Sequence, residues 1–122
     1  MRKSHTKRKE FSISKMERLS DGFAIQTVFK KGSRASVEGA TLFVLSNNVG
    51  ENRFLCTFKH GFGNAVERNR VRRVSKEIYR FNKNSLKKSF DFVLLVSKYS
   101  YSFDVWQNRI CTLLQLLKVM ND

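Results

Sequence analysis

The sequence predicts an α+β protein, in the order helix, strands, helix, strand, helix. Apolar residues follow helical spacing in some segments and strand spacing in others, and one expected helix has a basic face opposite an apolar one. The chain has 122 residues, of which 41% are hydrophobic, and its net charge is +14. These values favour one packed domain over residues 15–122, preceded by a basic, flexible arm at 1–14.

The first expected element is a short helix that begins after Ser20-Asp21 and ends at Gly32. Either Ser20 or Asp21 can cap it, and two lysines occupy its last turn. Three apolar side chains share one face at helical spacing: Ile25, Val28 and Phe29. We expect this face to pack on a sheet.

Three later segments have the composition of strands. Residues 41–46 and 53–58 flank the turn-rich 47–50, a spacing that suits an antiparallel pair. Residues 90–96 are apolar almost throughout, so we expect a central strand. Residues 104–120 are expected to form a core-facing helix capped by Ser100 or Ser102. Its core positions are Trp106, Ile110, Leu113, Leu114 and Leu117.

The stretch from 59 to 84 contains a helix with two faces. A step of about 100° per residue gathers five basic residues in one arc, with no acid at i,i+4 facing them because Glu67 and Glu77 lie off this arc: Arg68, Arg72, Arg73, Lys76 and Arg80. A second arc is apolar and is expected to face the core: Val71, Val74, Ile78 and Phe81. A solvated helix usually interleaves charges of both signs, so the basic arc indicates a polyanionic partner.

The excess positive charge is confined to two blocks. Residues 1–31 carry nine bases and three acids, and residues 59–88 carry ten bases and two acids, while the other segments balance. No apolar run approaches the roughly 18 residues of a membrane span, and no secretory signal follows the basic N-terminus. We therefore expect a cytoplasmic protein that does not bind membranes, with Cys56 and Cys111 as buried free thiols.

The segment that leads into the basic helix is suited to contact with phosphates. Glycines at 61 and 63 permit close approach of the backbone, and Asn64 with the first helical amides can hold a phosphate. Residues 68–73, RNRVRR, then supply four guanidinium groups, which favour forked hydrogen bonds to phosphate oxygens. Asn69 adds a neutral group for a sugar hydroxyl or a base edge.

Residues 63–73, GNAVERNRVRR, closely resemble the signature of the protein subunit of bacterial ribonuclease P. The resemblance extends along residues 15–120, and VFKKG at 28–32 looks like the exit of that family's first helix. It implies a two-layer α/β sandwich similar to the second domain of ribosomal protein S5, with a left-handed crossover through the basic helix. The usual rule for parallel strands would predict the opposite hand.

The resemblance also implies a function in tRNA processing. A catalytic RNA subunit, which binds divalent metal such as magnesium, would hydrolyse precursor tRNA at the mature 5′ end. The protein would supply no catalytic residue, bind no metal by itself and need no obligate protein partner. It would bind the RNA subunit through seven residues: Asn64, Arg68, Asn69, Arg70, Arg72, Arg73 and Lys76.

A cleft between the sheet and the first helix would hold the single-stranded 5′ leader of precursor tRNA. The residues expected there are Phe29, Lys31, Phe43, Thr57 and Lys59. The two phenylalanines can be core residues, or they can form a stacking platform where each base contributes about 1–3 kcal/mol. Where relatives usually have Ser-Lys-Lys-x-Gly, this chain has KHGFG at 59–63, which lowers the local charge.

Other functions are weaker interpretations of the same sequence. A structural RNA-binding protein of ribosomal type would fit the fold and the charge equally well. A protein-only nuclease needs acids arranged for two metals or a His-based acid–base pair, and the sequence shows neither. A binder of anionic membranes needs an exposed apolar face on the basic helix, which we expect the core to cover.

Overall fold

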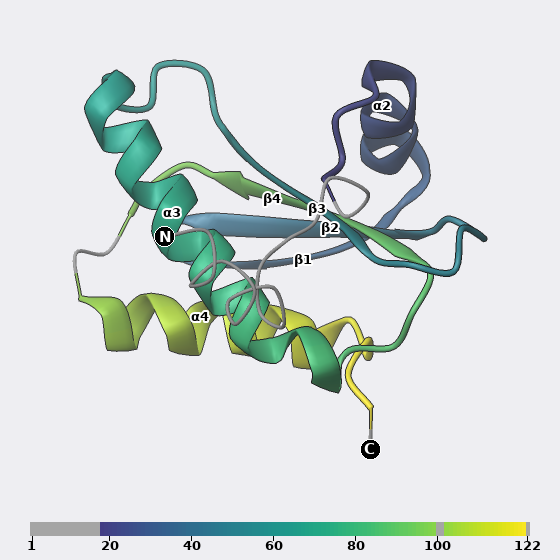
Figure 1. Ribbon diagram of the computed structural model, residues 1–122. Coiled ribbons are helices and arrows are strands. Elements are labelled where there is room, and N and C mark those ends of the chain that lie inside the picture. The colour runs from purple at the N-terminus through teal and green to yellow at the C-terminus, as the bar shows by residue number, and fades with distance from the viewer. Residues whose placement is uncertain (1–17, 100–101, 122) are drawn as a thin grey trace, which may run out of the picture.

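The computed structural model describes residues 18–99 and 102–121 (Figure 1). The elements are α2 (Gly22–Lys31), β1 (Ser33–Val37), β2 (Ala40–Ser46), β3 (Arg53–Phe58), α3 (Ala65–Asn82), the short 3-10 helix η2 (Lys83–Ser85), β4 (Phe90–Val96) and α4 (Phe103–Leu116). The predicted order of helix, strands, helix, strand and helix is confirmed. The arm predicted at residues 1–14 lies outside the described residues.

The four strands form one sheet in the order β1-β2-β4-β3. β4 pairs antiparallel with β2 and parallel with β3, so residues 90–96 form an inner strand, as predicted. α3 makes the crossover connection that two parallel neighbours require. Figure 1 shows α3 and α4 on one face of the sheet and α2 on the other.

The predicted antiparallel pairing of residues 41–46 with 53–58 is wrong. These strands do run in opposite directions, but β4 lies between them. The turn after β2 is tied to the start of β4, where Asn47 Nδ2 donates to Asp91 Oδ1 at 2.8 Å and the backbone N–H of Phe90 donates to Asn52 Oδ1 at 2.9 Å. Turn composition reports a local reversal of the chain, whereas the pairing partner is chosen by burial of the apolar strand β4.

β1 was not anticipated from the sequence. Its residues, SRASV, are mostly exposed, and it adds an antiparallel edge to β2 with Ser33 opposite Val44 and Val37 opposite Ala40. The strand carries little apolar signal because only a few of its side chains contact the core. Its conformation is set by pairing with β2 directly across a tight reversal.

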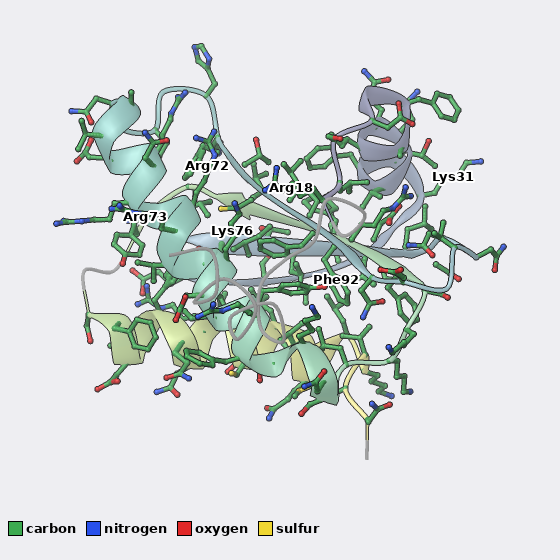
Figure 2. The ribbon with its side chains drawn as sticks, in the orientation of Figure 1. Arg18, Lys31, Arg72, Arg73, Lys76 and Phe92 are labelled. Atoms are coloured by element: carbon green, nitrogen blue, oxygen red, sulfur yellow. The ribbon has the colours of Figure 1, made fainter. Side chains whose placement is uncertain are left out.

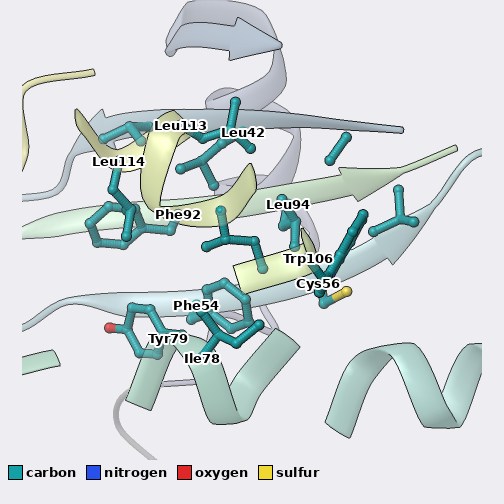
Figure 3. Packing of buried hydrophobic residues seen from close by; sticks show 14 of the residues in the cluster. Leu42, Phe54, Cys56, Ile78, Tyr79, Phe92, Leu94, Trp106, Leu113 and Leu114 are labelled. Atoms are coloured by element: carbon teal, nitrogen blue, oxygen red, sulfur yellow. The ribbon is translucent and has the colours of Figure 1, made fainter. Parts of the chain in front are cut away.

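The larger core lies between the sheet and the helices α3 and α4 (Figure 3). Phe54 of β3 stacks on Tyr79 of α3 with ring centroids 4.5 Å apart. Trp106 of α4 is buried, and its Nε1 donates to Ser75 Oγ of α3 at 3.0 Å, which ties the two helices together.

The residues of α4 predicted as core are buried, except Leu117, which is half-buried at the helix end. Ser102 caps α4, as predicted, and its Oγ accepts from the N–H of Val105, while the alternative cap Ser100 lies outside the described residues.

The apolar arc predicted for α3 is rotated in the structure. The buried residues of α3 are Val71, Ser75, Ile78 and Tyr79. Because Ser75 and Tyr79 turn inward, Phe81 lies roughly 105° from the middle of this buried side at 100° per residue and remains 58% exposed. Phe81 is therefore not a core residue, and the guanidinium of Arg80 lies 5.5 Å from its ring centroid.

β3 and β4 are also held together by an ion pair between the half-buried Arg53 and the buried Asp91. Arg53 binds both carboxylate oxygens of Asp91 with Nε–Oδ1 at 2.7 Å and Nη2–Oδ2 at 2.8 Å. The hydrogen bond to Asp91 raises the pKa of Arg53. Because Arg53 and Asp91 are opposite each other in the parallel register, the pair specifies how the two strands align.

Gly32 ends α2, as predicted, but not through a left-handed backbone, because its φ is −72°. A Cβ at this position would lie 2.6 Å from the carbonyl oxygen of Val28 and 2.9 Å from that of Val44. Glycine is needed because α2 and β2 approach each other closely here.

We expect Gly32→Ala to destabilise the protein by about 1–3 kcal/mol, since backbone atoms must move to admit the methyl group. Gly22→Ala is the matched control, because a Cβ at Gly22 meets nothing within 4 Å. That variant should be neutral or more stable by up to about 1 kcal/mol. Equilibrium denaturation in guanidinium chloride measures both, and equal stability of the two variants would contradict the close-approach explanation.

Candidate nucleic-acid interface

α3 begins with a closed capping box. Asn64 Oδ1 accepts from the N–H of Glu67 at 2.9 Å, and Glu67 Oε1 accepts from the N–H of Asn64 at 3.0 Å. The helix N-terminus therefore already holds a carboxylate, which repels phosphate. The capping box occupies the backbone amides of Asn64 and Glu67, so the expected phosphate contact would have to use the Asn64 Nδ2 group or other amides of the first turn.

The bases of α3 point in different directions. Arg68, Arg72 and Lys76, spaced four residues apart, flank the buried side of the helix along β3. Arg73 lies on the opposite side and extends away from the body of the protein, as Figure 2 shows. The single basic row expected from the sequence is therefore a broad surface that reaches around the helix.

Two aromatic rings hold the arginines nearest to β3. Phe58, the last residue of β3, stacks on Phe62 with ring centroids 5.1 Å apart. The guanidinium carbons of Arg72 and Arg68 lie 5.0 and 5.8 Å from the Phe58 centroid. Arg68 Nε also donates to the carbonyl of Phe62 at 2.8 Å. These contacts restrict the directions in which both guanidinium groups can point.

The role of Phe62 was not found from the sequence. The cluster of Phe58, Phe62 and the two arginines joins a strand, a loop and a helix. The only sequence signal for it was the pair of phenylalanines four residues apart across a turn. Asn69 has a related role, since its Oδ1 accepts from Arg72 Nη1 at 3.3 Å.

Arg80 differs from the other bases of α3. Its Nη2 lies 2.6 Å from Glu77 Oε2, so the expectation that no acid faces the basic arc is wrong at this end of the helix. Arg70 and Arg73 are exposed, and in the part of the chain that the structure describes neither has an ion-pair partner. The N-terminal half of α3 therefore presents the accessible positive charge.

The second candidate surface lies beside α2, on the opposite face of the sheet. Phe29 and Phe43 meet edge to face with centroids 4.8 Å apart. Phe43 is 6% exposed because α2 covers it, so it is a core residue and not a stacking surface. Phe29 is 37% exposed and lies on Phe43, which leaves part of its ring accessible.

The other residues expected at this surface are spread along it. Thr57 is half-buried opposite Leu95 of β4, two strands away from β2. Lys59 is exposed just after β3, and Lys31 is exposed at the end of α2. Figure 2 shows Lys31 far from the labelled bases of α3, so the two basic regions are separate.

The two cysteines are free. Cys56 is buried, as predicted, whereas Cys111 is only half-buried. Burial raises the pKa of Cys56 to about 12, although a hydrogen bond with Ser75 and the charges of Arg72 and Lys76 oppose this shift. The thiol of Cys56 therefore stays protonated at neutral pH and cannot act as a nucleophile.

Within residues 18–99 and 102–121, no group of three or more His, Cys, Asp or Glu side chains is placed to hold a metal ion. The helices described there include none that is both long and apolar enough to span a membrane.

Comparison with known proteins identifies the family. The family model described as Ribonuclease P matches residues 13–118. The chain belongs to the ribonuclease P protein family. A relative, the ribonuclease P protein component of Borrelia hermsii, is 38% identical over 96 residues, which are 78% of this chain and 82% of the relative. That of Natranaerobius thermophilus is 32% identical over 83 residues, or 68% of this chain and 72% of the relative.

Solved structures agree with this assignment. The RNase P protein from Thermotoga maritima superposes with a TM-score of 0.74 at 27% identity, covering 82% of this chain and 96% of that one. The Staphylococcus aureus RNase P protein gives a TM-score of 0.78 at 21% identity over 86% of this chain and 98% of that one, which supports the fold. As a ribonuclease P protein component, the chain is part of an endoribonuclease of tRNA processing and associates with its RNA.

We expect Cys56→Ala to lose less stability at alkaline pH than the unchanged protein. The thiol has an ordinary pKa of 9.0 when unfolded and a pKa of about 12 when folded. Between these values only the unfolded state releases the proton, so the thiol lowers the free energy of unfolding by about 1.4 kcal/mol per pH unit. This stability is fully present below pH 9 and is lost as the pH rises. Denaturation curves at pH 8, 9 and 10 measure the slopes, and identical slopes would contradict the assignment.

Proposed function

We propose that the chain binds the RNA subunit of ribonuclease P through the N-terminal half of α3 and holds the 5′ leader of precursor tRNA beside α2. The RNA subunit then removes the leader endonucleolytically to give the mature 5′ end. The observation that carries this proposal is the arginine surface of α3, fixed on Phe58 in a member of the ribonuclease P family. We expect the complex to act in the cytoplasm.

The proposed contact with the RNA subunit uses arginines whose directions are restricted and basic side chains that are exposed to solvent. Arg68 and Arg72 have restricted directions, which lowers the entropy lost when their forks bind phosphate oxygens. Arg70, Arg73 and Lys76 are exposed, so each can follow the backbone of the RNA. Asn69 and the Nδ2 group of Asn64 would add neutral hydrogen bonds to sugars or base edges.

The proposed contact with the leader uses the sheet face beside α2. The partly exposed ring of Phe29, supported by Phe43, is suited to stack on one unpaired base. Thr57 can hydrogen-bond to the single-stranded leader, and Lys31 and Lys59 bring positive charge to two ends of this face. Because this face and α3 lie on different sides of the sheet, both RNAs can be bound at once.

The protein's own chemical contribution is binding and positioning. Two RNAs that approach each other repel, and the excess of lysine and arginine lowers this repulsion by neutralising phosphates, while the released counterions favour binding. We propose that magnesium or another divalent ion is bound mainly by the RNA subunit, since the described side chains converge at no metal-ligand group. The metal supplies phosphodiester hydrolysis, and the protein alone is not expected to cleave.

Arg68→Ala and Arg70→Ala should each weaken binding of the RNA subunit by roughly five- to tenfold, because each removes a charge-assisted phosphate contact. The slope of log affinity against log salt concentration should fall by about 1 in each variant. Filter binding at several salt concentrations measures both quantities. Arg34→Ala is the control, since Arg34 is an exposed arginine of β1 at the opposite edge of the sheet. Unchanged affinity of both α3 variants would show that α3 is not the RNA-binding element.

Phe29→Ala should weaken binding of precursor tRNA by about 1–3 kcal/mol, through loss of one stacked base. Affinity for mature tRNA, which has no leader, should not change. Phe23→Ala is the matched control, because Phe23 lies in the same helix and is 80% exposed. Equal losses for leader-bearing and leaderless tRNA would place the leader elsewhere.

Reconstitution tests the function as a whole. We expect the protein to stimulate leader removal by the cognate RNA subunit at low magnesium concentration and moderate salt, where RNA–RNA repulsion is strong. Co-sedimentation with ribosomal subunits without such stimulation would instead indicate a structural RNA-binding protein. Cleavage by the protein without the RNA subunit would overturn the division of roles.

A further inference from the structure

A small pocket lies at the outer edge of β3, between this strand, residues 18–20 and α3. Its volume is about 200 Å³, and its lining includes Phe54, Cys56, Arg18, Arg72 and Lys76. Sites for whole drug-sized ligands are larger, roughly 300–1,000 Å³, so this pocket has room for a single ring system. Neither the α3 surface for the RNA subunit nor the leader surface beside α2 uses it as a cavity.

The floor of the pocket is apolar and rigid. Phe54 is fixed by stacking on Tyr79, and Cys56 is buried in the core cluster beside it. Burial keeps the Cys56 thiol protonated, so the floor carries no charge and no nucleophile. A flat, uncharged ring is the group that such a floor can cover.

The edge of β3 adds backbone groups that can recognise a ring. The N–H of Lys59 donates to Val96 of β4, whereas the carbonyl of Phe54 accepts from Leu19 on the outer side. Backbone groups alternate along a strand, so those of Cys56 also point outward. The bridge between Arg18 and Phe54 is isolated and is not continued to Cys56 within the described residues. The N–H and C=O of Cys56 can therefore pair with the polar edge of a base.

The rim of the pocket is positively charged. Arg18 comes from the segment before α2, whereas Arg72 and Lys76 come from α3 (Figure 2), and none of the described residues in the lining is acidic. Three positively charged side chains at the mouth of an apolar pocket fit an anionic group attached to a ring. Inorganic phosphate would use the rim but not the floor, and an uncharged ring would use the floor but not the rim.

We propose that this pocket binds one unstacked nucleotide of an RNA, with its base on Phe54 and Cys56 and its phosphates at Arg18, Arg72 and Lys76. The proposal rests on the proposed RNA-binding function, which supplies the partner. It extends that function, because Arg72 and Lys76 would bind a flipped-out nucleotide together with Arg18 from a distant part of the chain. Hydrogen bonds from Cys56 would make the site responsive to base identity, unlike the phosphate contacts of α3.

The test uses the full chain, labelled with nitrogen-15, and three probes: adenosine 5′-monophosphate, adenosine and inorganic phosphate. We expect the monophosphate to shift the amide signals of Leu19, Leu55 and Cys56, and to bind at least about tenfold more tightly than either other probe, because it alone uses both floor and rim. Equal affinity of monophosphate and phosphate, or shifts confined to α3, would overturn the proposal.

Variants locate the binding. Ser20→Trp places a large side chain at the exposed mouth and should abolish the shifts, and Arg18→Gln should weaken binding roughly three- to tenfold. Arg34→Gln, which removes an exposed arginine at the opposite edge of the sheet, should change nothing. If Arg34→Gln weakened monophosphate binding as much as Arg18→Gln does, binding would depend only on the net charge of the protein. That result would overturn the proposal.

Binding of the RNA subunit by the unchanged protein is measured in the same preparation. If the RNA subunit binds and the monophosphate does not, only the nucleotide pocket is wrong. If the monophosphate binds as described and the RNA subunit does not, the proposed function is wrong while the pocket remains a nucleotide site.

Discussion

β4 must be covered on both faces and paired along both edges, and the positions of the other elements follow from this requirement. Phe92, Leu94 and Val96 lie in the core under α3 and α4, and Val93 lies in the core under α2. Its edges are occupied by β2 and β3. An apolar strand with neither face exposed can only be placed in the middle of such a structure, because exposure of either face would leave apolar area in water.

This position of β4 explains why α3 exposes its basic side chains to solvent. A crossover between the parallel strands β3 and β4 must travel along the sheet, and α3 does so on the face that it shares with α4. The helix buries one side and leaves the side near the edge strand β3 open to solvent. Phe58 then meets Arg68 and Arg72 where β3 ends, so the same geometry that buries α3 also orients two of its arginines.

The layered arrangement also separates the two candidate RNA surfaces. α2, which contains Phe29 and Lys31, packs on the face of the sheet opposite to α3. A protein with one basic surface would bring two RNAs into competition for the same site. Surfaces on both sides of a thin sheet would allow one small domain to contact both RNAs of the proposed function simultaneously.

The sequence by itself determined the three main helices, the strands β2, β3 and β4, and the central place of β4, because periodicity and composition act over a few residues. It did not determine that β4 separates β2 from β3, nor that Ser33–Val37 forms a strand, since both depend on partners far along the chain. Likewise, the arginines of α3 could be listed from the sequence, but their directions could not. Burial of Tyr79 and Ser75 sets the rotation of the helix on the sheet. The contacts of Arg68 and Arg72 with Phe58, and the pocket that Arg72 shares with Arg18, arise only when separate segments pack together.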